Sequence, residues 1–300
     1  MSLRNVALLG ATGTLGSKIL TALNRAGFNV TAIQRKESTK SAPNAAKSLK
    51  VDLNSSSDLA SAFMGQDFVV AATPNPRLAT EKFWMEAAIQ AGVKRIIPSE
   101  FSTNLEAKAS QSLPIVKDKL EIRKYVEELG ASGKIEWTSV NNGPFCVGFL
   151  WTSGFVGPNL KNQTTTFHDG GNNIVCTSTL ERIGESVAKV LATEHLESTK
   201  NKPVYTYSAA VSERKMTDVF AKIKGITFEE TEVSIESVTK AAFEALEKGD
   251  MSKFMDFYIP FCFDPEYHGD FRDIAWNDKL GLPVMTDEEL EELARGWTVV

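Results

Sequence analysis

Three glycines at intervals of three residues follow a short apolar run near the start of the chain, and this feature constrains the fold most. The run Val6-Ala-Leu-Leu9 predicts a buried strand, and residues 15–26 predict a helix. Between them, Gly10 permits a tight turn, Gly13 lets the backbone approach a phosphate, and Gly16 lets the helix pack on the strand. The helix N-terminus favours an anion. The pattern predicts a dinucleotide-binding loop rather than a purely structural turn, with contacts from Gly10, Thr12, Gly13, Thr14, Leu15 and Gly16.

Short apolar runs alternate with helical periodicity through the first half of the chain. This alternation is typical of parallel strand–helix–strand units, whose right-handed crossovers build a doubly wound sheet. The sequence therefore predicts an α/β (Rossmann) fold with a smaller C-terminal substrate lobe. Further strands are expected at 29–33, 49–51, 67–71, 95–98 and 135–140, and helices at 57–63, 80–91 and 116–129.

The alternation becomes irregular after Asn141. We expect residues 1–150 to form the nucleotide-binding domain and residues 151–300 mainly to form the substrate lobe. Residues 204–224 are the open alternative, because they would also suit one more strand and helix of the first domain. Helices are expected at 178–191, 212–224, 234–247 and 251–258, and a capping box from Thr286 to Glu289 opens the last helix.

The charge and cysteine content exclude several classes of partner. A net charge of −5 without a basic stripe argues against nucleic acid or an anionic membrane. Three cysteines far apart in sequence have no metal-binding spacing and suit a reducing compartment. No apolar run is long enough for a membrane helix, and the first one is too short for a signal peptide. We expect a cytoplasmic monomer or homodimer that binds a small molecule and no metal.

Arg35, at the end of the second expected strand, bears on the choice of dinucleotide. An acidic residue there would bind the ribose 2′-hydroxyl of NAD, whereas a guanidinium pairs with the 2′-phosphate of NADP. Lys36 or Lys40 would add a second positive charge, and a solvated surface arginine is the alternative interpretation. Rossmann geometry further predicts that Asp52 approaches the adenine and that Thr73 lies along a ribose. The sequence thus favours NADP(H).

Several common catalytic motifs are missing. No tyrosine is followed by lysine four residues later, and neither G-x-S-x-G nor H-E-x-x-H occurs. His168, His195 and His268 are far apart in sequence, and we expect surface or loop positions for them rather than catalysis. A proton-transfer group, if the chain is an enzyme, must come from elsewhere.

A wider set of motifs resembles the NmrA-like, isoflavone-reductase-like family of atypical short-chain dehydrogenases. The set comprises the glycine loop, Arg35, Lys94-Arg-Ile-Ile-Pro-Ser-Glu-Phe101, Lys119-x-x-x-Arg123-Lys124 and Val140-x-x-x-x-Phe145. The resemblance is clearest over the first 150 residues. The family includes plant pinoresinol and phenylcoumaran benzylic ether reductases. The loop Asn141-Asn-Gly-Pro-Phe145 departs from the plant form and is more similar to fungal members.

The resemblance implies roles for individual residues. Lys119 replaces the usual catalytic tyrosine, with Lys117 as a rival, and Asn142 and Phe145 border the nicotinamide. Lys119 and Arg123 are four residues apart on one helix face, so we expect both to point into the cleft, where Arg123 orients Lys119 or contacts a cofactor phosphate. Like charge and desolvation would both favour the neutral lysine. From the residues alone, a solvated basic helix face is equally consistent.

Aromatic residues are frequent after residue 144. Phe145, Phe149, Trp151 and Phe155 form one group, and Phe254, Phe257, Tyr258 and Phe261 form another; each suits a pocket or a core. The leading hypothesis is an NADPH-dependent reductase of a small aromatic or conjugated metabolite. The alternatives are a dinucleotide-binding regulator that acts through a protein partner, and a redox-neutral isomerase or dehydratase on the same fold.

Overall fold

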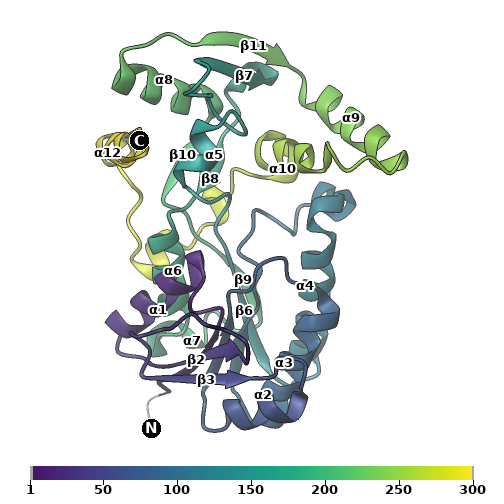
Figure 1. Ribbon diagram of the computed structural model, residues 1–300, viewed down its shortest axis with the longest axis vertical. Coiled ribbons are helices and arrows are strands. Elements are labelled where there is room, and N and C mark those ends of the chain that lie inside the picture. The colour runs from purple at the N-terminus through teal and green to yellow at the C-terminus, as the bar shows by residue number, and fades with distance from the viewer. Residues whose placement is uncertain (1–2, 299–300) are drawn as a thin grey trace.

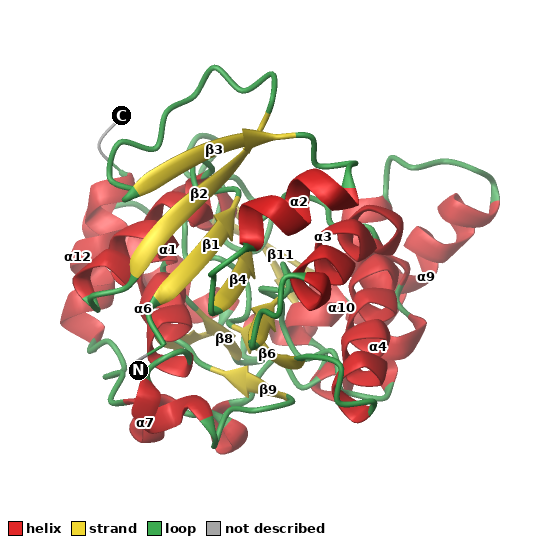
Figure 2. Ribbon diagram, turned by 90° about the horizontal axis from the view of Figure 1, so that it is seen from below, coloured by secondary structure: helices red, strands yellow, loops and turns green. Residues whose placement is uncertain are grey.

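A seven-stranded parallel sheet forms the centre of the protein. The computed structural model describes residues 3–298. The strand order is β3-β2-β1-β4-β5-β6-β9 (Figures 1 and 2). The order reverses between β1 and β4, which is where open α/β sheets bind their ligands. The strands are β1 (Asn5–Leu9), β2 (Asn29–Arg35), β3 (Lys47–Val51), β4 (Phe68–Ala71), β5 (Arg95–Ile97), β6 (Glu136–Asn141) and β9 (Lys202–Tyr205).

Helices cover both faces of this sheet, as Figure 2 shows. On one face α1 (Thr14–Arg25) and α6 (Leu180–Val190) pack against each other and against β1. On the other face lie α2 (Ser56–Phe63), α3 (Leu78–Gln90) and α4 (Lys117–Ala131). Strands β1 and β4 have apolar side chains towards both layers, and burying them on both sides stabilises the sheet. The predicted doubly wound α/β fold is therefore confirmed.

The chain returns to the sheet after the first 150 residues. Strand β9 pairs in parallel with β6, and α6 covers the sheet beside α1. The helix after β9, α8 (Glu213–Lys224), packs instead in the second lobe against α12 (Asp287–Trp297). Of residues 204–224, the strand therefore joins the nucleotide-binding sheet and the helix does not.

The second lobe contains two small sheets and several short helices. Strand β7 (Thr164–His168) pairs with β11 (Glu229–Val233), and β8 (Val175–Thr177) pairs with β10 (Ala209–Val211). These strands lie in the stretches that we expected to be irregular or did not assign, since three to five residues are too few for a clear periodicity. The remaining α-helices are α5 (Gly148–Thr152), α7 (Thr193–Leu196), α9 (Ile235–Glu247), α10 (Tyr258–Phe263) and α11 (Asn277–Leu280).

Helix α10 begins where the sequence predicted a helix to end. Residues 251–258 were expected to be helical, but only a 3₁₀ turn (Phe254–Phe257) forms there. Pro260 has no backbone N–H to donate, so it suits the first turn of a helix that starts at Tyr258. The predicted capping box is confirmed, because Thr286 and Glu289 exchange hydrogen bonds at the start of α12.

An apolar cluster joins the two lobes. It brings Leu113 and Val116, before α4, against Phe257 and Phe261 of the second lobe. Figure 1 shows α10 beyond the N-terminal end of α4.

The other 3₁₀ turns are Ala109–Ser112, Pro114–Val116, Asp169–Gly171, Pro265–Tyr267 and Arg272–Ile274. Across residues 3–298, no helix has the length and apolar character needed to cross a membrane.

Candidate functional site

The glycine loop is pressed against the end of β4. Gly10 has φ +80°, and a Cβ atom there would lie 2.3 Å from the Ala72 carbonyl oxygen. A Cβ atom on Gly16 would lie 2.0 Å from the Gly10 carbonyl oxygen. Both distances are far below van der Waals contact, so no side chain fits at either position. The loop therefore sits at the reversal of the strand order, between β1 and β4.

The N-terminus of α1 is open to an anion. Gly13 is the N-cap residue, no side chain caps the helix, and its first turn holds no acidic residue. The positive end of the helix dipole is thus uncompensated next to the loop. Thr12, Thr14 and Leu15 belong to this loop and first turn, where they are half-buried or exposed.

The segment after β2 carries the expected basic residues. Arg35 is exposed, and its guanidinium makes no hydrogen bond or ion pair within residues 3–298. The Lys36 ammonium lies 3.4 Å from the Asp58 carboxylate, whose negative charge offsets the positive charge of the lysine. Gln34 donates to the Lys40 carbonyl oxygen at 2.9 Å and holds the segment in place. A hollow of about 720 Å³ beside the glycine loop is lined by both Thr12 and Lys40, but not by Arg35.

Asp52 and Thr73 follow β3 and β4, and both side chains already have partners. The Asp52 Oδ1 atom accepts from the Asn54 backbone N–H at 2.9 Å. The Thr73 hydroxyl donates to Glu81 at 3.1 Å, and Ser99 donates to the Thr73 carbonyl oxygen at 2.8 Å. Burial raises the pKa of Glu81. These bonds tie the carboxyl ends of β4 and β5 together at the edge of the crevice.

Lys119 opens onto a cavity of about 280 Å³ between the two lobes. The side chain is half-buried, and its Nζ atom has no hydrogen bond or ion pair among the described residues. Most of the surrounding side chains are apolar. The cavity is lined by Phe101, Ser102, Thr103, Ile115, Val116, Lys119, Gly143, Phe145, Val147, Phe149, Leu150, Tyr258 and Phe261. The rival Lys117 is exposed and does not line this cavity.

Burial lowers the pKa of Lys119. Removing the ammonium from water lowers the pKa of Lys119 from about 10.5 to about 8, and the carboxylate of Glu100 opposes part of this shift. The amine therefore exchanges its proton close to neutral pH, which suits a general acid or base.

Arg123 corrects an expectation from the sequence. It does not line the cavity with Lys119, because Glu100 at the end of β5 draws the guanidinium into the core. Nε donates to Glu100 Oε2 at 2.9 Å, Nη2 donates to Oε1, and Nη2 also donates to Ser139 at 2.8 Å. Since Glu100 neutralises this arginine, like charge is not what shifts Lys119. The sequence string that ends in Glu100-Phe101 thus supplies the anchor of α4, which sequence reasoning missed.

Of the residues that follow β6, some line the cavity and others are buried in the core. Phe145 lines the cavity together with Lys119. Asn142 is fully buried and does not line the cavity; its Nδ2 donates to the Gly143 carbonyl oxygen at 2.7 Å, and its backbone N–H donates to Ser102. The Asn142 Oδ1 atom has no partner within residues 3–298.

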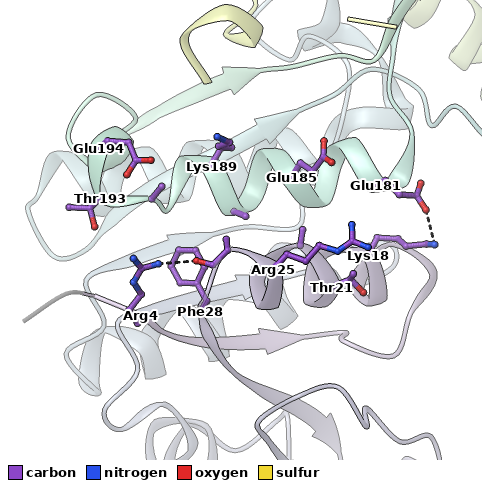
Figure 3. A pocket seen from close by; sticks show the side chains of 14 residues that line it. Arg4, Lys18, Thr21, Arg25, Phe28, Glu181, Glu185, Lys189, Thr193 and Glu194 are labelled. Carbon is purple, nitrogen blue, oxygen red and sulfur yellow. Dashed lines mark hydrogen bonds and ion pairs between the residues drawn. The ribbon is translucent and has the colours of Figure 1, made fainter. Parts of the chain in front are cut away.

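A separate hollow of about 550 Å³ lies between α1 and α6 (Figure 3). Half of its lining residues are charged, and Lys18 pairs with Glu181 across it at 2.7 Å. It contains neither the glycine loop nor Lys119. An apolar substrate is therefore better accommodated by the cavity at Lys119.

One histidine differs from expectation. His168 is buried, and its Nδ1 lies 2.7 Å from Glu213 Oε1 while its backbone N–H donates to Oε2 of the same residue. The expectation of a surface or loop position is wrong for His168, because β7 and α8 pack together there. In the described part of the chain, no group of three histidine, cysteine or acidic residues is arranged to hold a metal.

Known proteins match this chain over most of its length. It is 28% identical to the oxidoreductase aprR of Aspergillus flavus, over 97% of this chain and 99% of that protein. It is 26% identical to bifunctional pinoresinol-lariciresinol reductase 2 of Linum usitatissimum, over 77% of this chain and 74% of that protein.

Solved structures share the fold at lower identity. The leucoanthocyanidin reductase–NADPH complex from Vitis vinifera superposes with a TM-score of 0.76 at 17% identity, covering 99% of this chain and 100% of that one. The model of the NmrA-like family matches residues 3–258, which is most of the chain. The chain therefore belongs to the NmrA-like family.

Proposed function

We propose that the protein is an NADP-dependent oxidoreductase that reduces a small aromatic or conjugated metabolite. One observation carries this proposal: Lys119 is an unpartnered lysine with a pKa of about 8, and it faces an apolar cavity between the lobes. The oxidoreductase and reductase names of the relatives, and the NADPH in the Vitis vinifera complex, support the same class.

The residues of the first lobe fit a dinucleotide. Gly10 and Gly16 leave no room for side chains, and the open N-terminus of α1 suits the pyrophosphate. Arg35 has no partner among residues 3–298 and is available for a 2′-phosphate, while Lys40 and Thr12 line the neighbouring hollow. When bound, NADPH supplies the hydride.

Lys119 is the proton donor of the proposed reaction. The Lys119 ammonium would give its proton to the substrate oxygen or conjugated atom on which negative charge develops during the reduction. With a pKa of about 8, roughly nine in ten lysines carry this proton at pH 7. The Glu100–Arg123 pair fixes α4 and therefore the position of Lys119.

The cavity limits the substrate. Its volume of about 280 Å³ and its phenylalanine lining suit a small, flat and mainly apolar molecule. The Linum usitatissimum relative is named as a reductase of pinoresinol and lariciresinol, which are compounds with aromatic rings.

The test compares Lys119→Met with Lys117→Met in a screen of aromatic ketones, enones and quinones that follows NADPH oxidation and product formation. Lys117 is exposed two residues earlier on the same helix and is the matched control. We expect Lys119→Met to lose about 10²- to 10⁴-fold in kcat with unchanged NADPH affinity. Equal rates in both variants would exclude the proton-transfer role. NADPH binding without turnover of any compound would favour a regulator, and product formation without NADPH consumption would favour an isomerase or dehydratase.

A further inference from the structure

We propose that the Tyr258 hydroxyl donates a hydrogen bond to an oxygen acceptor of the substrate, so that the substrate is an aromatic ketone or a related oxygen-bearing ring compound held between Tyr258 and Lys119. This inference rests on the proposed function for the identity of the site. It adds a contact from the second lobe, 139 residues beyond Lys119 in the chain.

Tyr258 lines the same cavity as Lys119 but comes from the opposite lobe. It is the first residue of α10, and its side chain is half-buried. Its hydroxyl has no hydrogen bond within residues 3–298, and its oxygen is not among the fully buried side-chain atoms that lack a partner. The buried Tyr205, in contrast, donates to Glu106 at 2.8 Å. Tyrosine hydroxyls in protein interiors nearly always have a partner, so a ligand or water must bind that of Tyr258.

The ring of Tyr258 is held in place before any ligand binds. It stacks on Phe155 with ring centroids 5.6 Å apart and an interplanar angle of 30°. Two further residues of α10 are buried: Ile259 in an apolar cluster of the second lobe, and Phe261 in the cluster that joins the two lobes. A fixed donor loses little conformational entropy when it binds an acceptor, which favours a specific contact.

Tyr258 and Lys119 have different chemical roles in the cavity. Burial raises the pKa of Tyr258 well above its usual value, so the hydroxyl keeps its proton and remains a donor. Lys119 exchanges its proton near pH 8. The lining contains this one basic side chain and no carboxylate among the described residues, and so it offers no counter-charge for a cationic ligand. An oxygen acceptor on a flat ring can accept a hydrogen bond from both groups, and the mainly apolar lining favours the uncharged acceptor of a ketone.

The test uses two probes with the same ring skeleton, 1-indanone and indane, which differ in the carbonyl oxygen. Their affinities for the NADP⁺-loaded protein are measured by ligand-observed NMR, so no turnover is needed. We expect wild type to bind 1-indanone more tightly, and Tyr258→Phe to weaken 1-indanone about fivefold while leaving indane unchanged. Tyr125→Phe is the control, because its hydroxyl contacts Glu86 outside the cavity.

Three outcomes with wild type and Tyr258→Phe would overturn the proposal. These are equal weakening of both probes in Tyr258→Phe, unchanged binding of both, and no detectable binding of either probe to wild type. Loss of the carbonyl preference in Thr103→Val alone would move the donor to the first lobe and also overturn it. Because binding is measured without reduction, a failure of the proposed reductase activity leaves this test intact. Thermal unfolding of each variant identifies any that do not fold.

Discussion

The Arg123 guanidinium donates from Nε and Nη2 to the two carboxylate oxygens of Glu100, and both residues are almost completely buried. This pair connects α4, which carries Lys119, to the end of β5. It also brings the Glu100 carboxylate close enough to raise the pKa of Lys119 against the larger effect of burial. One ion pair thus anchors the helix of the candidate proton donor and also moderates the effect of burial on its pKa.

Removing one member of this pair will destabilise the fold. Arg123→Met leaves the Glu100 charge buried without its partner, and we expect the free energy of unfolding to fall by about 3–5 kcal/mol. The measurement is urea denaturation followed by circular dichroism. Lys124→Met, at the exposed neighbouring position, is the control and should change the stability by less than about 0.5 kcal/mol. A loss below about 1 kcal/mol in Arg123→Met would contradict the importance of the pair.

Reductase activity will depend on pH through Lys119. The ammonium is the donor and the pKa is about 8, so kcat should be highest below pH 8 and decline as the pH rises through that value. The profile is measured at saturating NADPH with any substrate found in the screen. Lys119→Met should show a low rate without this decline. A wild-type rate that increases between pH 7 and 9 would assign Lys119 as a base instead.

The same lysine will destabilise the folded state at neutral pH. Its folded pKa is lowered from about 10.5 to about 8, so the unfolded chain binds more protons between these values and stability rises with pH. The penalty is fully present below pH 8 and disappears by about pH 10.5. Lys119→Met should therefore resist urea better than wild type at pH 7, and the difference should shrink at higher pH. A difference independent of pH would point to packing rather than charge.

Arg35 will decide between the two dinucleotides. We expect Arg35→Ala to weaken NADPH binding about tenfold or more while NADH binding changes little, because only NADPH carries the 2′-phosphate. Nicotinamide fluorescence gives both affinities. Equal effects on the two cofactors would show that Arg35 does not recognise the phosphate and is a solvated surface residue.

Gly16 will not accept a side chain. Gly16→Ala places Cβ 2.0 Å from the Gly10 carbonyl oxygen, so the glycine loop must move, and both NADPH affinity and stability should fall. Gly296→Ala is the matched control, since nothing lies within 4 Å of its Cβ in helix α12 and alanine favours a helix by up to about 1 kcal/mol. Unchanged NADPH binding in Gly16→Ala would contradict the role of this loop.

Local patterns in the sequence were sufficient for the first lobe. Strand, glycine turn and helix are adjacent in the chain between Val6 and Ala26, and each depends on neighbouring residues, so periodicity and glycine spacing predict them. The short strands of the second lobe could not be predicted in this way. Strand β11 carries exposed residues along its whole length, and its place is set by pairing with β7, more than 60 residues away.

The candidate site required the tertiary structure. The sequence identified Lys119 by resemblance and placed Arg123 beside it on the helix, but helix spacing says nothing about what faces the helix. Glu100, 23 residues from Arg123, attracts that guanidinium away from the cavity, and Tyr258 reaches the cavity from the other lobe. Burial, which lowers the pKa of Lys119, is a property of all the elements packed around it. The sequence by itself determined the fold of the first lobe and identified the lysine, whereas packing between distant segments decided that lysine's pKa and the residues that surround it.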